Sequence, residues 1–192
     1  MIILGIAAPF GHDHSAAILV DGKLIAAAEE ERFTRKKHAD GQMPINAVKY
    51  CVKQAGIDPR DIDRVAYPWS YKALRDKRFE YFVRTIRTKP SRAIKKFFRN
   101  NRELADQKRF TAATLSASGI DPAKIKMDWV EHHIAHAASS FYFSGAAEAA
   151  VLSIDAGGEI TATLMGYADH RGIVPTKQII APDSLGDFYS TM

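Results

Sequence analysis

Two histidines and an aspartate have the residue types and the spacing for metal chemistry. His132 and His136 are four residues apart. On a helix that spacing puts both imidazoles on one face, where one cation can take a nitrogen from each. Asp155 follows a hydrophobic stretch that predicts a buried strand, and a carboxylate at the C-terminal end of a strand is a natural further ligand in an α/β protein. For the two histidines alone, packing or capping at a helix N-terminus is the alternative.

A glycine turn begins at the same aspartate. The sequence DAGGE occupies residues 155–159, between predicted strands over 149–155 and 161–168. A strand, a tight glycine turn and a second strand expose backbone N–H groups, which can hold phosphate oxygens. An ordinary hairpin turn is the alternative.

Two other polar segments contain groups that can move protons or bind anions. In the sequence GHDHS over 11–15, His12 can serve as a general base or acid near neutral pH. His14 has the same chemistry, and a plain polar turn is the alternative for both. Internal ion pairing is one explanation of the charged stretch over 29–38. Arg35, Lys36 and Lys37 in that stretch are also candidate anion contacts.

The hydrophobic pattern predicts a mixed-sheet α/β domain that would position these residues. Asp21-Gly22 predicts a two-residue hairpin turn between the second and third strands. Ser184, with Asp183, can cap a final helix. Strands are expected over 2–7, 15–20, 23–28, 63–69, 126–130, 149–155, 161–168 and 173–180, and helices over 45–55, 110–118 and 135–143.

The positive charge is concentrated in one segment. The 192-residue chain has a net charge of +5, but residues 72–109 contain 14 Lys or Arg and four acids, so the rest of the chain is acidic. Apolar residues recur there at spacings near three and four, which predicts one or two amphipathic helices, with Pro90 between them. A solvated helical insertion is the simplest explanation, and recognition of a phosphate-bearing ligand is an alternative. No nucleic-acid-binding motif accompanies the charge, so we expect no nucleic-acid partner.

The composition, 46% hydrophobic and 26% charged, excludes a disordered or collagen-like chain. Cys51 is the single cysteine, so no disulfide can form within the chain, which fits a reducing, cytoplasmic setting. No apolar run approaches the ~20 residues that span a bilayer, so we expect no membrane partner.

Four motifs, taken in order, resemble a known family. They are GHDxSAA over 11–17 running into DGK over 21–23, EEERFTRKKH over 29–38, HHIAHAAS over 132–139 and DAGGE over 155–159. Together they resemble the O-carbamoyltransferases of the nodulation-factor, aminoglycoside and cephamycin type. The hydrogenase-maturation carbamoyltransferase and the tRNA threonylcarbamoyl transferases share the underlying domain.

The resemblance implies the ribonuclease H-like motif of the sugar-kinase/actin-type α/β superfamily. Residues 1–192 would form the first lobe of the carbamoyl-transfer domain, with a basic helical insertion at about 71–118. The downstream lobe and a C-terminal domain would be absent. On this expectation the fragment alone is inactive and self-association through an uncovered face would not be surprising.

The resemblance also implies a reaction. In the family, carbamoyl phosphate and ATP give a carbamoyl-adenylate, and the carbamoyl group then passes to a hydroxyl of a small-molecule acceptor. By this resemblance, His132, His136 and Asp155 match the family's ligands of a divalent metal, which is iron by preference, with zinc or manganese as alternatives. His12 matches the histidine that deprotonates the acceptor hydroxyl, and Asp13 and Lys37 match residues of the substrate pocket. Gly157, Gly158 and Glu159 match the turn on the phosphate side.

The chain departs from the family pattern at one position, and two other functions are possible. The family usually has glycine directly after the metal-binding aspartate, where this chain has Ala156. A tRNA-modification factor of the threonylcarbamoyl type, with residues 72–109 as its RNA-binding surface, is one alternative function. A non-catalytic nucleotide-binding domain of the same superfamily, with no metal at the histidines, is the other.

Overall fold

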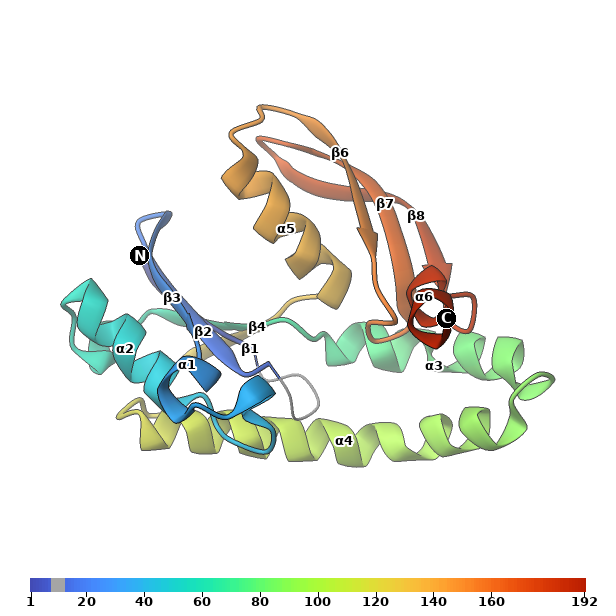
Figure 1. Ribbon diagram of the computed structural model, residues 1–192, viewed down its shortest axis with the longest axis horizontal. Coiled ribbons are helices and arrows are strands. Elements are labelled where there is room, and N and C mark those ends of the chain that lie inside the picture. The colour runs from blue at the N-terminus through green and yellow to red at the C-terminus, as the bar shows by residue number, and fades with distance from the viewer. Residues whose placement is uncertain (8–12) are drawn as a thin grey trace. The chain divides into compact units, whose positions relative to one another are not determined.

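The strands of this chain form two separate sheets (Figure 1). The computed structural model describes residues 1–7 and 13–192. These divide into two compact units: unit 1 contains Met1–Pro68 and Leu104–Trp129, and unit 2 contains Trp69–Glu103 and Val130–Met192. The α/β class is confirmed. The chain leaves the first sheet after its fifth strand and builds a second, and the assignment of residues 1–192 to the first lobe of a larger domain stays a prediction.

The sheet of unit 1 has five strands in the order β3-β2-β1-β4-β5. The first three pair antiparallel, and β4 and β5 add in parallel, so that Gly5 lies opposite both Ala17 and Ala66. This is the strand order of the ribonuclease H-like motif, as expected. The strand bounds are β1 Ile2–Ala7, β2 Ser15–Val20, β3 Lys23–Glu29, β4 Arg64–Tyr67 and β5 Lys126–Trp129.

The predicted hairpin turn joins β2 to β3. Asp21 and Gly22 both have positive φ, 49° and 80°, which is the backbone of a type I′ turn and suits the twist of the strands on either side. The sequence signal and the structure agree here because the turn chemistry is local.

Helix α2 (Ile45–Ala55) covers one face of this hairpin. Val48, Cys51 and Val52 are buried on the side of the helix that faces the sheet, and Gly56 ends the helix with a φ of 64°. The carboxylate of the buried Glu30 accepts hydrogen bonds from the backbone N–H groups of residues 46 and 47 at the start of the helix.

The charged stretch over 29–38 is not a plain loop, because it forms α1 (Glu31–Thr34) and the short 3-10 helix η1 (Lys37–Ala39). The expected internal ion pairing is present: the Arg32 guanidinium lies 3.0 Å from Glu29 and 3.7 Å from Glu31. The Glu31 carboxylate also accepts the backbone N–H of His38 at 2.8 Å. A second 3-10 helix, η2 (Pro59–Asp61), precedes β4.

Unit 2 contains the second sheet, formed by β6 (Ala149–Ile154), β7 (Thr161–Asp169) and β8 (Gly172–Ile180). All three strands are antiparallel, with Leu152 opposite Met165. Helix α5 (His132–Ser144) packs against this sheet, and α6 (Leu185–Thr191) follows β8.

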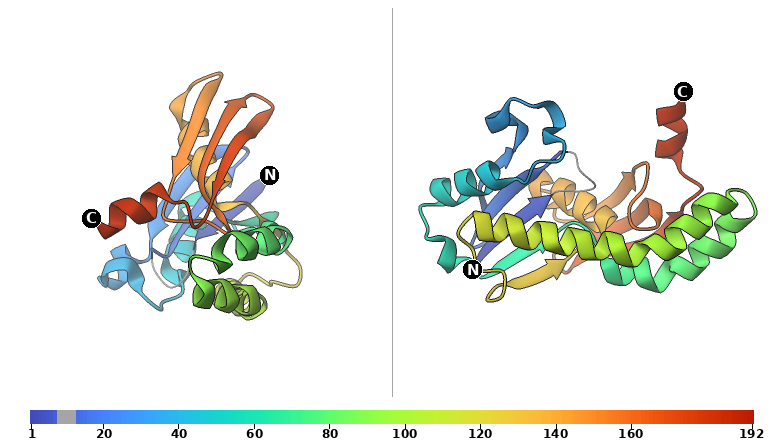
Figure 2. Two further views of the ribbon diagram at one scale, coloured as in Figure 1. Left: turned by 90° about the vertical axis from the view of Figure 1, so that its right-hand side faces the viewer. Right: turned by 90° about the horizontal axis from the view of Figure 1, so that it is seen from below.

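The basic segment forms two helices, α3 (Tyr71–Ile86) and α4 (Pro90–Ala117), close to the predicted range of 71–118. Pro90 separates them as expected, since proline fits the first turn of a helix. Phe82 and Phe97 are in ring contact across the pair at 5.1 Å, and Figure 2 shows the two helices side by side. The separate helix predicted over 110–118 is the end of α4. No helix in the described part of the chain is long and apolar enough to cross a membrane.

The thiol of Cys51 tests how α2 packs on the sheet. The side chain is fully buried and its Sγ atom lies 3.4 Å from the carbonyl oxygen of Ala16, and burial raises the pKa of the Cys51 thiol to about 11. At about pH 8 the native thiol should react with Ellman's reagent at least about 100-fold more slowly than the unfolded chain. Comparable rates for native and unfolded protein would show that the helix does not cover the sheet in this way.

Candidate metal centre

Helix α5 presents two histidines on one face. It begins at His132, three residues before the predicted start, and ends at Ser144, where Gly145 has a φ of 75°. His132 and His136 therefore lie one turn apart in the first two turns, and their Nε2 atoms are 3.0 Å apart. The spacing that suggested a shared ligand thus occurs on a helix, as expected.

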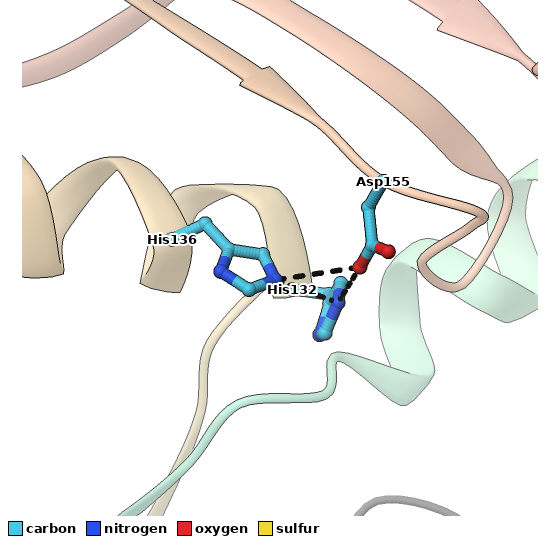
Figure 3. A group of neighbouring side chains, drawn as sticks. All are labelled: His132, His136 and Asp155. Carbon is cyan, nitrogen blue, oxygen red and sulfur yellow. Dashed lines mark hydrogen bonds and ion pairs between the residues drawn. The ribbon is translucent and has the colours of Figure 1, made fainter. Parts of the chain in front are cut away.

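Asp155 reaches the same point from the end of β6. Its Oδ2 atom lies 2.8 Å from Nε2 of His132 and 3.4 Å from Nε2 of His136, as Figure 3 shows. The Asp155 side chain is 37% exposed and that of His136 is 50% exposed. The three donor atoms thus converge at a point that a further ligand could approach.

The three donors fit a divalent cation. Ligand atoms about 2.1 Å from one cation lie roughly 3.0–3.4 Å apart at tetrahedral or octahedral angles. The three observed separations are 2.8, 3.0 and 3.4 Å. Two imidazole nitrogens and one carboxylate oxygen form a donor set that suits iron, zinc or manganese.

The electrostatics favour the metal-binding protonation states. Burial opposes ionisation of Asp155, but hydrogen bonds from His132 and from the Ala156 backbone N–H outweigh it, so the pKa of Asp155 lies below its ordinary value. Burial and the neighbouring His132 lower the pKa of His136. At neutral pH the carboxylate is ionised and His136 is neutral, as ligation requires.

The glycine turn after Asp155 lies directly against the start of α5. A Cβ atom at Gly158 would come within 3.1 Å of Cβ of His132 and 3.2 Å of Cδ2 of His133, whereas one at Gly157 would meet nothing within 4 Å. A side chain at 158 would crowd His132 and His133, so the glycine there suits the close approach of the turn to the helix.

Glu159 is buried at the centre of this contact. Its carboxylate accepts the backbone N–H of His132 at 3.1 Å and the backbone N–H of Ser70, which precedes α3. Burial raises the pKa of Glu159, although these N–H groups partly oppose the shift. The carboxylate thus joins the N-termini of two helices, while its expected contact with a nucleotide stays a prediction.

His133 lies on the buried side of α5 and is not part of the cluster formed by His132, His136 and Asp155. It is buried, and its ring nitrogens bond to Oγ of Ser153 at 2.7 Å and to the carbonyl oxygen of Thr161 at 2.9 Å. A carbonyl can only accept, so Nε2 carries the proton and Nδ1 accepts from Ser153. Burial lowers the pKa of His133 and favours this neutral form. His133 thereby fixes α5 to β6 and β7.

The start of α6 also contacts Asp155, through its N-cap residue Ser184 and through Gly186 in its first turn. The Ser184 hydroxyl donates to the carbonyl oxygens of Asp155 and Ala156, at 3.1 and 3.0 Å, and accepts the N–H of Asp187. A Cβ atom at Gly186 would lie only 2.3 Å from the carbonyl carbon of Asp155. Sequence reasoning identified Ser184 as a helix cap but missed this contact, since nothing local to residues 184–186 indicates it.

The remaining predicted residues belong to unit 1. Asp13 has a φ of 55°, and its carboxylate lies 2.8 Å from Nδ1 of His38. Its backbone N–H donates to the His38 carbonyl at 2.8 Å, so the motif containing Asp13 meets the motif containing Lys37. Lys37 begins η1, and His12 lies outside the described residues. The substrate-pocket roles of Asp13 and Lys37 and the role of His12 in deprotonating the acceptor hydroxyl stay predictions.

The α/β fold and the cluster of two histidines and an aspartate both agree with what the four sequence motifs predicted. Residues 2–192 match the protein family described as "Carbamoyltransferase N-terminus". The chain therefore belongs to the carbamoyltransferase family, and the predicted resemblance is confirmed.

Two relatives illustrate the relationship. The chain is 34% identical over 194 residues to "Uncharacterized protein sll1178" of Synechocystis sp., with 98% of this chain and 31% of that protein covered. It is 31% identical over 183 residues to nodulation protein NolNO of Sinorhizobium fredii, with 94% of this chain and 25% of that protein covered. The chain thus spans less than a third of the length of these curated relatives.

Among solved structures, YeaZ from Pseudomonas aeruginosa is similar with a TM-score of 0.46 and 13% identity, over 94% of this chain and 66% of that chain. A likeness of this degree says nothing about substrate or ligand.

A substitution at Gly186 tests whether the start of α6 holds Asp155 in place. Gly186→Ala forces a methyl group into the Asp155–Ala156 peptide, so we expect a loss of about 2 kcal/mol in unfolding free energy and weaker binding of divalent metal. Gly157→Ala is the matched control, because a Cβ there meets nothing within 4 Å. Thermal unfolding and metal titration of both variants check this, and equal behaviour would contradict the contact.

Proposed function

We propose that this chain is the N-terminal part of a carbamoyltransferase that makes a carbamoylated small molecule. The carbamoyl group would come from carbamoyl phosphate, pass through a carbamoyl-adenylate made with ATP, and end on a hydroxyl of the acceptor. Family membership supports the reaction class. The observation that carries the proposal is the convergence of His132, His136 and Asp155 within 3.4 Å of one another.

These three residues would hold a divalent cation, iron by preference, with zinc or manganese as alternatives. When bound, the cation would hold the nucleotide phosphates and polarise the carbamoyl group. The protein's contribution is position: His132 packs against the Trp69 ring at 5.4 Å between centroids, and the Ala156 N–H holds the second oxygen of Asp155. Ligands fixed in this way need little reorganisation when substrate arrives.

The other matching residues would act on the substrates. His12 would take the proton from the acceptor hydroxyl, which makes the oxygen a better nucleophile for the carbamoyl carbon. Asp13 and Lys37 would contact substrate, with the Lys37 ammonium suited to a phosphate or carboxylate. The glycine turn at Gly157 and Gly158 would lie on the phosphate side, with the Gly157 N–H as the candidate donor, because the Gly158 N–H donates to the Thr161 carbonyl at 2.7 Å.

Metal content tests the site directly. The complete protein should contain about one equivalent of iron, zinc or manganese, and His132→Ala and His136→Ala should each lower it at least about tenfold, because each removes a ligand. Elemental analysis by mass spectrometry makes the measurement.

His170→Ala is the matched control for metal content, since this exposed histidine lies in the turn between β7 and β8. Unchanged metal content in both ligand variants would remove the proposed centre and favour a non-catalytic nucleotide-binding domain.

Transfer of label tests the reaction. Given [14C]carbamoyl phosphate, ATP and a panel of hydroxylated acceptors, the complete protein should label a small molecule, and Asp155→Ala should reduce this at least about 100-fold because it removes a metal ligand. Label that requires no ATP, or that appears in tRNA and in none of the small acceptors, would contradict the proposal. His170→Ala again serves as the control and should keep parental activity.

A further inference from the structure

The carboxylate of Glu159 contacts both the first residue of α5 and the residue that precedes α3. The proposed reaction does not explain these two contacts. The residue is 4% exposed, and the carboxylate lies between the start of α5 and the residue that precedes α3. The backbone N–H of Ser70 donates to Oε1, and the backbone N–H of His132 donates to both oxygens, at 3.1 Å to Oε1 and 3.3 Å to Oε2. A buried carboxylate at the N-termini of two helices is well placed electrostatically, since both helix ends are positive.

The two backbone groups that Glu159 binds are tied to the same metal ligand. His132 supplies one of them directly. Ser70 supplies the other, and it follows Trp69, whose buried ring packs on the His132 imidazole. The carboxylate therefore sets both the backbone from which the His132 side chain projects and the position of the ring that packs against that side chain.

The neighbouring glycine makes this arrangement possible. Gly158 has no side chain, which lets the turn approach Cβ of His132. The Gly158 backbone N–H donates to the carbonyl oxygen of Thr161 at 2.7 Å. The Glu159 side chain therefore points toward α5 and Ser70, where its carboxylate accepts the backbone N–H groups of His132 and Ser70.

We propose that Glu159 is a positioning residue for the metal centre, which fixes His132 and Trp69 by accepting the N–H groups of His132 and Ser70 and makes no contact with nucleotide or metal. This inference rests on the proposed function in that the His132 side chain matters because it binds metal. It assigns Glu159 a role different from that of a phosphate contact in the glycine turn.

Two substitutions of Glu159 distinguish a residue that positions His132 from one whose negative charge acts directly on the metal. Glu159→Gln keeps an acceptor oxygen at the Oε1 position for both N–H groups, while it replaces Oε2, the weaker acceptor for His132 at 3.3 Å, with an amide group and removes the negative charge. Glu159→Ala removes both the acceptors and the charge. For the complete protein freed of metal, the Mn²⁺ dissociation constant should rise at least about tenfold in Glu159→Ala and stay within about threefold of the parent in Glu159→Gln. Titration calorimetry with Mn²⁺ alone measures this.

Two controls exclude a general loss of stability or of charge. Glu148→Ala removes an exposed carboxylate of the same unit, which bonds only to Tyr167 among the described contacts, and should keep parental Mn²⁺ affinity. Ile180→Val trims the core of Ile160, Ile180 and Tyr81, so it should lower the unfolding temperature while keeping Mn²⁺ affinity. Glu159→Ala that lowers stability but leaves affinity unchanged would show a purely structural role and overturn the proposal.

A second measurement needs no metal. In protein labelled with 5-fluorotryptophan, the ¹⁹F resonance of Trp69, assigned by its loss in Trp69→Phe, should move in Glu159→Ala and return toward the parental position in Glu159→Gln. A resonance unmoved in Glu159→Ala overturns the proposal, as does a Glu159→Gln variant as impaired as Glu159→Ala in Mn²⁺ binding. A parent that binds no Mn²⁺, iron or zinc contradicts the proposed function instead, and the ¹⁹F measurement still tests Glu159.

Discussion

The close approach of the glycine turn to the start of α5 is the constraint on which the metal centre depends. Asp155 is brought to the two histidines because the turn that follows it lies so close to the helix that a Cβ atom on Gly158 would be 3.1 Å from Cβ of His132. A turn displaced by the thickness of a methyl group would carry the Asp155 carboxylate away from nitrogens that it now meets at 2.8 and 3.4 Å. One missing side chain thus sets the geometry of the three ligands.

Helix α5 meets two demands with adjacent residues. His133, Ala137 and Phe141 are buried at spacings of four and face the sheet, while His132 and His136 lie on a partly exposed face. His133 differs in role from His132 and His136, because both of its ring nitrogens form hydrogen bonds within the protein, to Ser153 and Thr161. The motif of three histidines therefore divides into one that anchors the helix and two that can bind a ligand.

Much of this arrangement could be predicted from the sequence because its signals are local. The α2 bounds, the Asp21-Gly22 turn and the two basic helices follow from periodicity, glycine and proline. The pairing of His132 with His136 follows from helical spacing, and Asp155 from the end of a hydrophobic strand. The early start of α5 at His132 could not be predicted, because the carboxylate that meets its first N–H comes from Glu159, 27 residues away.

The contacts around the metal centre that the sequence did not reveal join distant segments. Ser184 and Gly186 support Asp155 from about 30 residues further along the chain, and Ser70 meets Glu159 across 89 residues. The short helices over 31–39 were also missed, since a charged stretch shows no apolar period. Its structure comes instead from Arg32 pairing with Glu29 and from Glu31 accepting the N–H of His38.

The departure from the family pattern at Ala156 has a physical explanation in the same turn. Ala156 is exposed, and its contribution to Asp155 is a backbone N–H that donates to Oδ1, which any residue except proline supplies. Space at Gly157 is open, whereas space at Gly158 is closed on three sides by His132, His133 and Thr161. Of the two glycines in the turn, only Gly158 has neighbours close enough for a side chain to crowd them. Alanine at the first therefore leaves the site's geometry intact, because the fold depends there on a donor and at Gly158 on the absence of a side chain.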